Sequence, residues 1–183
     1  MARPPRQASW RRWVPLAALA ALAAPAWAES TEAEVRAAFI YSFTKFVDWP
    51  ADALNATPGA LSVCLVGAPD ALFEALADLE GKTVKNRSLH VRVAGRTSNL
   101  KGCQVLVMSE SEAENFETVL KRLEGAPVLT VNGSGRFLDA GGIIGLFTEG
   151  GKLRFDINLE AARRNSLVLS SNLLKLARQV RQQ

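Results

Sequence analysis

Apolar residues recur every three or four positions between residues 32 and 47, which places them on one side of a helix. Thr31 and Glu34 stand at the spacing of a capping box, in which each residue satisfies a free backbone donor of the first turn. Trp49-Pro50 follows the run, and proline disfavours helical backbone in the residue before it. The pattern therefore predicts a helix that begins after Thr31 and ends before Pro50.

Short apolar runs alternate with amphipathic segments through the middle of the chain. The predicted strands are 61–66, 89–93, 105–108 and 127–131, the predicted helices are 70–79 and 110–123, and residues 51–60 are predicted to be loop. Alternation of strands and helices is typical of a parallel sheet covered by helices. The fold class that this pattern indicates is α/β.

The last third of the chain has a different pattern. Two apolar runs, 143–148 and 152–157, flank Glu149-Gly150-Gly151, which predicts a β-hairpin with a glycine turn. Residues 159–164 and 167–180 are each predicted to form a helix, from the spacing of their apolar positions. The whole pattern predicts a parallel-sheet sandwich with flanking helices and a C-terminal β-hairpin followed by helix.

The first 28 residues have the features of a secretory signal. The basic residues are Arg3, Arg6, Arg11 and Arg12, the apolar run is 14–24, and the small-residue site is Ala26-Trp27-Ala28. The run is shorter than the roughly 20 apolar residues that a spanning helix needs, which disfavours a membrane anchor. We expect cleavage after Ala28, release of residues 29–183 into the periplasm, and a single domain over that range.

Removal of this segment changes the charge of the protein. The full chain has a net charge of +4, from 22 basic and 18 acidic residues. Four of the basic residues and none of the acidic ones lie in the first 28 positions, which leaves 22 − 4 = 18 basic residues against 18 acidic ones. A nucleic-acid partner would need a basic patch, and a neutral mature chain gives no support for one.

The mature chain has two cysteines, Cys64 and Cys103. Two reduced thiols buried as small apolar groups are one interpretation. Export to an oxidising compartment favours the other, a disulfide between them.

The candidate chemistry in the chain is sparse. His90 is the only histidine and lies within an alternating strand, with no nucleophile motif beside it. One histidine and two cysteines that can pair with each other make a poor metal site. We therefore expect no catalytic residues, no metal and no cofactor.

Two further motifs have a structural and a functional interpretation. Residues 132–135, Asn-Gly-Ser-Gly, could form an anion-binding nest, but Leu138 replaces the third glycine of a dinucleotide fingerprint, so a tight turn is favoured. Trp49 and Lys45 could line a small-ligand cleft through a cation–π contact. Anchoring of the helix end by the tryptophan is the favoured alternative.

Three separated motifs occur in order along the chain: Ala37–Pro50, then Gly81–Val84 together with Cys103–Leu106, and then Gly141–Ile144 with Leu153–Leu159 and Leu169–Ala177. They resemble the motifs of YfiR-like periplasmic proteins. The resemblance covers nearly the whole mature chain. The chain lacks the second cysteine pair that family members often carry near the hairpin, so redox switching by that pair does not transfer to it.

The resemblance implies a regulator and no enzymatic activity. It implies that the protein binds the periplasmic sensor domain of an inner-membrane diguanylate cyclase and represses cyclic-di-GMP synthesis. An outer-membrane lipoprotein that sequesters the repressor is a further implied partner, and homodimers occur in the family. A small-molecule-binding periplasmic module without a cyclase partner is the alternative interpretation.

The family motif is concentrated around the predicted hairpin, which indicates a partner-binding surface there. The expected contact residues are Ile143, Ile144, Arg154, Asp156 and Asn158. The two isoleucines would be an exposed apolar anchor and the charged residues its rim. In the competing interpretation the isoleucines belong to the core and the charges are incidental.

Overall fold

The computed structural model describes residues 31–55 and 57–182, so the predicted signal and its cleavage site lie outside the described residues. The helices are α1 (Glu32–Phe46), α2 (Ala51–Asn55), α3 (Ala71–Ala77), α4 (Phe116–Arg122), α5 (Gly135–Asp139), α6 (Leu159–Arg164) and α7 (Ser171–Leu176), with 3₁₀ turns η1 (Leu100–Gly102) and η2 (Glu110–Asn115). The strands are β1 (Val47–Asp48), β2 (Ala60–Val66), β3 (Thr83–Val84), β4 (Arg87–Val93), β5 (Val105–Met108), β6 (Leu129–Asn132), β7 (Ile144–Glu149), β8 (Lys152–Asn158), β9 (Val168–Leu169) and β10 (Gln179–Arg181).

Eight strands of the described residues form one sheet in the order β10-β8-β7-β6-β5-β2-β4-β3. The strands from β4 to β7 in this order are parallel to one another, and β8 begins an antiparallel edge. The chain passes from β2 to β4 on one side and then crosses to β5 on the other. The direction of winding therefore reverses between β2 and β5, as in doubly wound α/β folds. The predicted α/β class with a mostly parallel sheet is confirmed.

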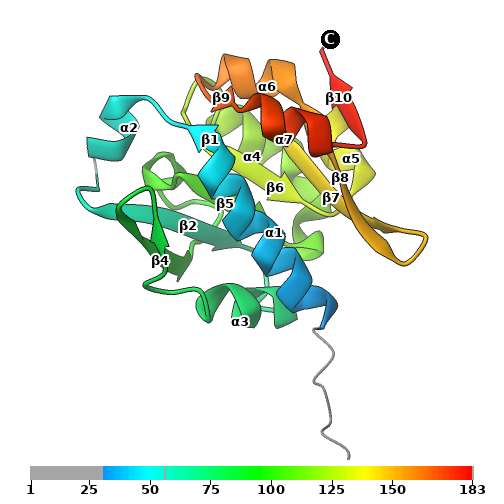
Figure 1. The fold of residues 1–183 in the computed structure, drawn as a ribbon, viewed down its shortest axis with the longest axis horizontal. Helices are drawn as coiled ribbons and strands as arrows, with labels where there is room; N and C mark the ends of the chain where they lie inside the picture. Colours follow the sequence, from blue (N-terminus) through cyan, green and yellow to red (C-terminus); the bar gives the residue numbers. More distant parts are fainter. Residues whose placement is uncertain (1–30, 56, 183) are drawn as a thin grey trace, which may run out of the picture.

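Helices cover both faces of this sheet, and Figure 1 shows α1 crossing in front of it with α4 behind. Alternate residues of a strand point to opposite faces. Val63 and Leu65 of β2 belong to the core shared with α1, whereas Cys64 and Val66 belong to the core under α4 and α5. Burial on both faces explains why β2 is apolar except for Ser62.

The predicted first helix is confirmed, together with its cap. The Thr31 hydroxyl accepts from the Glu34 amide at 3.2 Å, and the Glu34 carboxylate accepts from the Thr31 amide at 2.8 Å. The buried side of α1 includes Ile40 and Phe43, and the Phe43 ring lies 5.0 Å from that of Phe155 on β8. No helix within residues 31–55 and 57–182 is long and apolar enough to cross a membrane.

The predicted hairpin is also confirmed. Strands β7 and β8 pair from Ile144↔Ile157 to Glu149↔Lys152. Gly150 and Gly151 both have positive φ, at 58° and 71°, which a tight two-residue turn requires.

The prediction of one helix over residues 167–180 is wrong. This segment contains β9, the short helix α7 and β10. Ser170 caps α7 through its hydroxyl, and the residue after α7, Ala177, is extended. Pairing of β9 with β1 and of β10 with β8 supplies backbone hydrogen bonds that outweigh the helical preference of the leucine-rich sequence.

Three other segments differ from the predicted elements. Residues 110–123 are divided into η2 and α4, the predicted loop 51–60 contains α2, and α5 begins at the last residue of the Asn-Gly-Ser-Gly motif. The Asn132 side chain accepts from the Ser134 amide at 2.6 Å, which supports the tight-turn interpretation of that motif.

Candidate functional site

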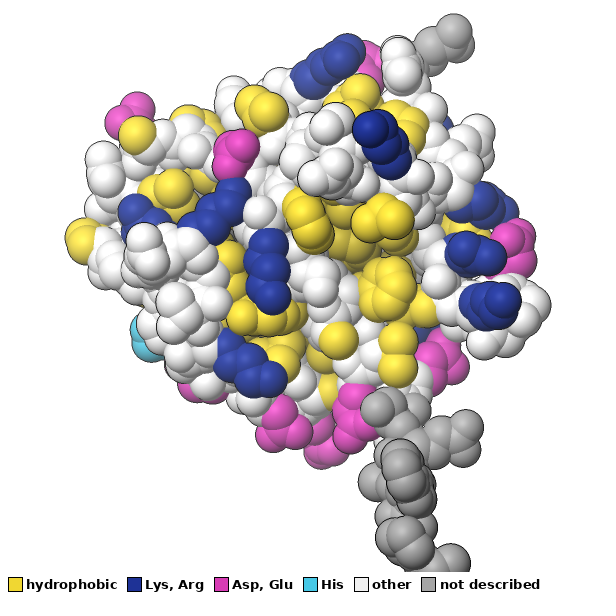
Figure 2. All heavy atoms as spheres, in the orientation of Figure 1, with side chains coloured by type: hydrophobic (Ala, Val, Ile, Leu, Met, Phe, Trp, Pro, Cys, Tyr) yellow, Lys and Arg dark blue, Asp and Glu magenta, His cyan; other side chains and the backbone are white. Residues whose placement is uncertain are grey.

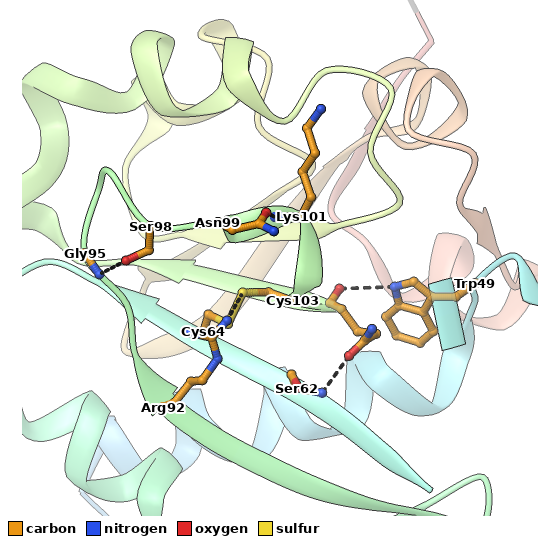
Figure 3. Close-up of a disulfide and its surroundings, with 10 residues drawn as sticks. Trp49, Ser62, Cys64, Arg92, Gly95, Ser98, Asn99, Lys101 and Cys103 are labelled. Carbon is orange, nitrogen blue, oxygen red and sulfur yellow. Dashed lines mark hydrogen bonds between the residues drawn. A yellow bond between two sulfur atoms is a disulfide. The ribbon is translucent and has the colours of Figure 1, made fainter. Parts of the chain in front are cut away.

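The expected disulfide joins Cys64 of β2 to Cys103, which precedes β5 (Figure 3). The two Cα atoms are 5.9 Å apart, and both side chains are buried. The Arg92 guanidinium lies beside the bridge, with Nη2 3.3 Å from Cys103 Sγ. The disulfide therefore fastens the two strands between which the winding of the sheet reverses.

Trp49 anchors the end of α1 to the sheet, as the favoured interpretation of that motif predicts. Its indole donates to the Gln104 carbonyl at 3.1 Å, and the Gln104 side chain in turn accepts from the Ser62 amide at 2.7 Å (Figure 3). Lys45 lies over the ring of Tyr41, with Nζ 4.2 Å from the ring centroid. The ligand cleft between Lys45 and Trp49 is therefore the wrong alternative.

His90 is exposed on β4, and its Nδ1 lies 2.8 Å from the carboxylate of Glu80. This environment matches the expectation of a satisfied strand residue. Within the residues that the structure describes, no three His, Cys, Asp or Glu side chains converge as metal ligands would.

The two isoleucines of the expected partner-binding surface are core residues. Ile143 and Ile144 both have 0% exposure. Ile144 pairs with Ile157 on the side of the sheet that packs against α1, and the Ile143 amide donates to the Thr130 hydroxyl at 3.0 Å. The prediction that they form an exposed anchor is wrong, because Gly141 and Gly142 lead the chain directly into a central strand.

Asp156 and Asn158 are also buried, against expectation. The two carboxylate oxygens of Asp156 accept from Nε and Nη2 of Arg178 at 3.0 and 2.5 Å. The side chain of Asn158 accepts from the Ala161 amide at 3.0 Å and so caps α6. Both residues make internal contacts of the fold, and the expectation that Asp156 is an exposed strand position is wrong.

Arg154 is the one residue of the expected set that is exposed. It pairs across the hairpin with Phe147, so both side chains lie on the face of β7 and β8 opposite α1. The guanidinium of Arg178 lies over the Phe147 ring at 4.5 Å and also pairs with Glu149 at 2.9 Å. We call this set, Phe147, Glu149, Arg154 and Arg178, the hairpin face.

Arg178 organises the hairpin face. Its hydrogen bonds to Asp156, with a smaller contribution from Glu149, raise the pKa of its guanidinium above the ordinary value. The positively charged guanidinium of Arg178 therefore lies over Phe147, and its pairing with Asp156 links the start of β10 to β8. A hollow of about 290 Å³, lined in part by Leu138, lies beside these residues.

Sequence reasoning did not identify Arg178 or Phe147. Arg178 directly follows the Leu169–Ala177 motif, but the helix predicted over it gave its side chain no defined partner. One signal in the sequence could have identified Arg178. Asp156 places a carboxylate between Phe155 and Ile157 in the predicted strand, and a buried carboxylate would need a basic partner.

A family model described as YfiR/HmsC-like matches residues 33–178 of the chain. Among solved structures, a conserved domain protein from Vibrio cholerae is similar with a TM-score of 0.55 and 13% sequence identity, over 84% of this chain and 61% of that one. The ABC domain from Streptococcus pneumoniae in complex with L-Trp is similar with a TM-score of 0.52 and 12% identity, over 70% of this chain and 58% of that one. At these identities the two structures establish the shared fold, and this chain spans about three-fifths of their length.

Proposed function

The chain belongs to the YfiR/HmsC-like family, and from that membership we propose that it represses an inner-membrane diguanylate cyclase by binding the cyclase's periplasmic sensor domain. The family is one of periplasmic regulators that act on a protein partner. The observation that carries the proposal is the family match over residues 33–178, which spans the strands from β1 to β9, the hairpin and the Arg178 pairing.

The hairpin face is the surface that we assign to the sensor domain. Aromatic and arginine side chains are enriched at the centres of protein interfaces, and Phe147, Arg154 and Arg178 supply both types on one face. Arg154 is exposed and forms no ion pair among the described residues. A carboxylate on the partner is the chemistry that would match it.

The proposed mechanism is a shift of population. A repressor that binds the inactive conformation of the sensor more tightly than the active one lowers the fraction of active sensor. The ratio of its affinities for the two conformations sets the largest shift it can cause. The pairing of Arg178 with Asp156 and Glu149 positions the arginine on the hairpin face before the partner arrives. Preorganisation of this kind reduces the entropy lost on binding.

Deletion of the gene tests the role, with cyclic-di-GMP as the readout. Loss of the protein should raise cellular cyclic-di-GMP, and the rise should disappear when the responsible cyclase is deleted as well. An unchanged cyclic-di-GMP level in the single deletion would contradict repression. It would favour the alternative, a ligand-binding module without a cyclase partner.

Charge reversal at Arg154 tests the surface. Arg154→Glu should fold normally, because the position is exposed, and should fail to restore repression in the deletion strain. Arg163→Glu on α6 is the matched control, since Arg163 is another exposed arginine without an ion pair among the described residues. Full repression by an exported Arg154→Glu protein would remove the hairpin face from the proposal and leave the role itself standing.

A further inference from the structure

A cleft of about 500 Å³ lies at the carboxyl ends of β5 and β6, between the start of α1 and the start of α3. The winding of the sheet reverses between β5 and its neighbour β2. In open α/β sheets, ligands bind outside the carboxyl ends of the strands at this point of reversal. The volume of the cleft is in the range of small-molecule sites. The cleft is separate from the hollow beside the hairpin face.

The base of the cleft is apolar. Its accessible part is formed by Ala33 of α1 and Leu72 of α3. Ile40, Val107, Val131 and Leu146 belong to the same lining but are nearly inaccessible to solvent. Ala33 and Leu72 are therefore the side chains that would pack against the apolar body of a ligand.

The rim of the cleft carries more negative than positive charge. Glu32, Asp70 and Glu110 are its acidic residues and Arg36 its basic one, an excess of two carboxylates. Figure 2 shows acidic side chains gathered at the end of the molecule where α3 and the start of α1 lie, while the hairpin end is mostly basic. The field at the mouth of the cleft therefore attracts cations.

The guanidinium of Arg36 is already held by its neighbours. Nε and Nη2 donate to Glu32 at 3.0 and 2.9 Å, and Nη1 donates to the Leu146 carbonyl at 3.2 Å. Glu32 also accepts from the Thr148 hydroxyl at 2.8 Å, and this bond together with Arg36 lowers the pKa of the Glu32 carboxyl. Because Glu32 balances its charge and its donors are in use, Arg36 is a poor binding group for an anion.

Glu110 is the carboxylate left to meet a ligand. Asp70 is used as the cap of α3, where it accepts from the Phe73 amide at 3.0 Å. Glu110 forms no ion pair with any described residue, and its Oε1 lies beside the space in front of Gly133. A Cβ placed on Gly133 would be 2.8 Å from this oxygen and 2.9 Å from Nη1 of Arg36, so the glycine keeps the cleft open between them.

We propose that this cleft binds a small organic cation with an apolar body, the ammonium group on Glu110 and the body on the apolar base. The site is a binding site distinct from the partner surface. It does not depend on the proposed repression of a cyclase.

A charge series of probes tests the proposal on the purified mature protein. 2-Phenylethylamine, 2-phenylethanol and 3-phenylpropionate share an apolar body and differ in charge. Two-dimensional NMR with millimolar probe should show shifts of the backbone amides of residues 107–110 and 131–133 with the amine, weaker shifts with the alcohol and none with the acid. Equal shifts with amine and alcohol, or no shifts with the amine, would overturn the proposal.

Two pairs of variants locate the site. Glu110→Gln should weaken binding of 2-phenylethylamine by about tenfold, since a charge-assisted hydrogen bond is lost. Glu117→Gln, an exposed carboxylate of α4, should leave binding unchanged. Gly133→Ala should weaken binding, because its Cβ would displace the Glu110 carboxylate, whereas Gly135→Ala meets nothing within 4 Å and should bind normally.

Thermal unfolding of each variant separates loss of binding from loss of fold. Tight binding of the amine by a folded Glu110→Gln protein would show that this carboxylate does not hold the cation, and would overturn the assignment. Because the readout is direct binding, failure here leaves the cyclase proposal intact, and an unchanged cyclic-di-GMP level in the deletion strain leaves this site intact.

Discussion

The carboxylate of Asp156 is 3% exposed and accepts two hydrogen bonds from Arg178. Asp156→Arg would place two guanidinium groups against each other in that position, and the buried charge would have no partner. We expect the unfolding temperature to fall by at least about 5 °C. Differential scanning calorimetry measures it, with Arg154→Glu as the exposed control on the same strand. A wild-type unfolding temperature for Asp156→Arg would contradict the buried pairing.

Gly142 is a second position where the surroundings decide the effect of a substitution. A Cβ on Gly142 would overlap the ring of Phe137, which is itself fully buried. Gly142→Ala should destabilise the protein by about 1–3 kcal/mol through overpacking. Chemical denaturation measures the loss, and Gly135→Ala, where a Cβ has open space, should show none of it. Equal stability of the two variants would show that Phe137 can move aside.

The environment of Asp156 shows what the sequence could and could not predict. Alternation of charged and apolar residues from Arg154 to Ile157 correctly predicted a strand and which residues share a face. It could not show whether that face is covered. The cover is Arg178, 22 positions later in the chain, and contacts between distant segments leave no periodic signal.

At the level of elements, strands buried on both faces were the easiest to predict. The runs that became β2 and β5 are apolar except for Ser62, and their length is that of a strand. The C-terminal segment was harder, because α7 and β10 owe their conformations to pairing with distant strands. The hairpin face was missed for the same reason, since it needs β10 to be placed beside β8.

The part of β4 that β3 does not cover is protected by a charged side chain. β3 pairs with Arg87 and Ser88, and Leu89 exchanges backbone hydrogen bonds with Gly81 and Lys82, which leaves β4 from His90 onward at the edge. The carboxylate of Glu80 accepts from the Val91 amide at 2.6 Å and lies beside His90. A charge on an exposed strand edge discourages pairing with another chain.

Glu80→Ala should therefore promote self-association through β4. The substitution frees the Val91 amide and removes the charge, so the mass measured by light scattering after gel filtration should rise with protein concentration more steeply than for wild type. Glu74→Ala on α3, another exposed carboxylate, is the control. Identical masses for Glu80→Ala and wild type at every concentration would show that Glu80 does not protect the edge.

For the molecule as a whole, the state of the two cysteines should show whether the protein is exported. Protein recovered from the periplasm should contain no free thiols when it is denatured without reductant. Its intact mass should correspond to a chain that begins at Glu29. The Cys64→Ala/Cys103→Ala double variant should lose about 4 kcal/mol of unfolding free energy, as expected for a bridge that spans 39 residues. Two reactive thiols per chain, or a retained signal, would contradict the assignment to the periplasm.

The pairing of β1 with β9 has a consequence for the order of folding. Val47↔Leu169 joins positions 169 − 47 = 122 residues apart, directly after α1. A chain that emerges from a translocation channel with its N-terminus first presents α1 long before β9 can reach it. Contacts of such sequence separation form slowly. The pairing of β1 with β9 therefore cannot form until nearly all of the chain has emerged.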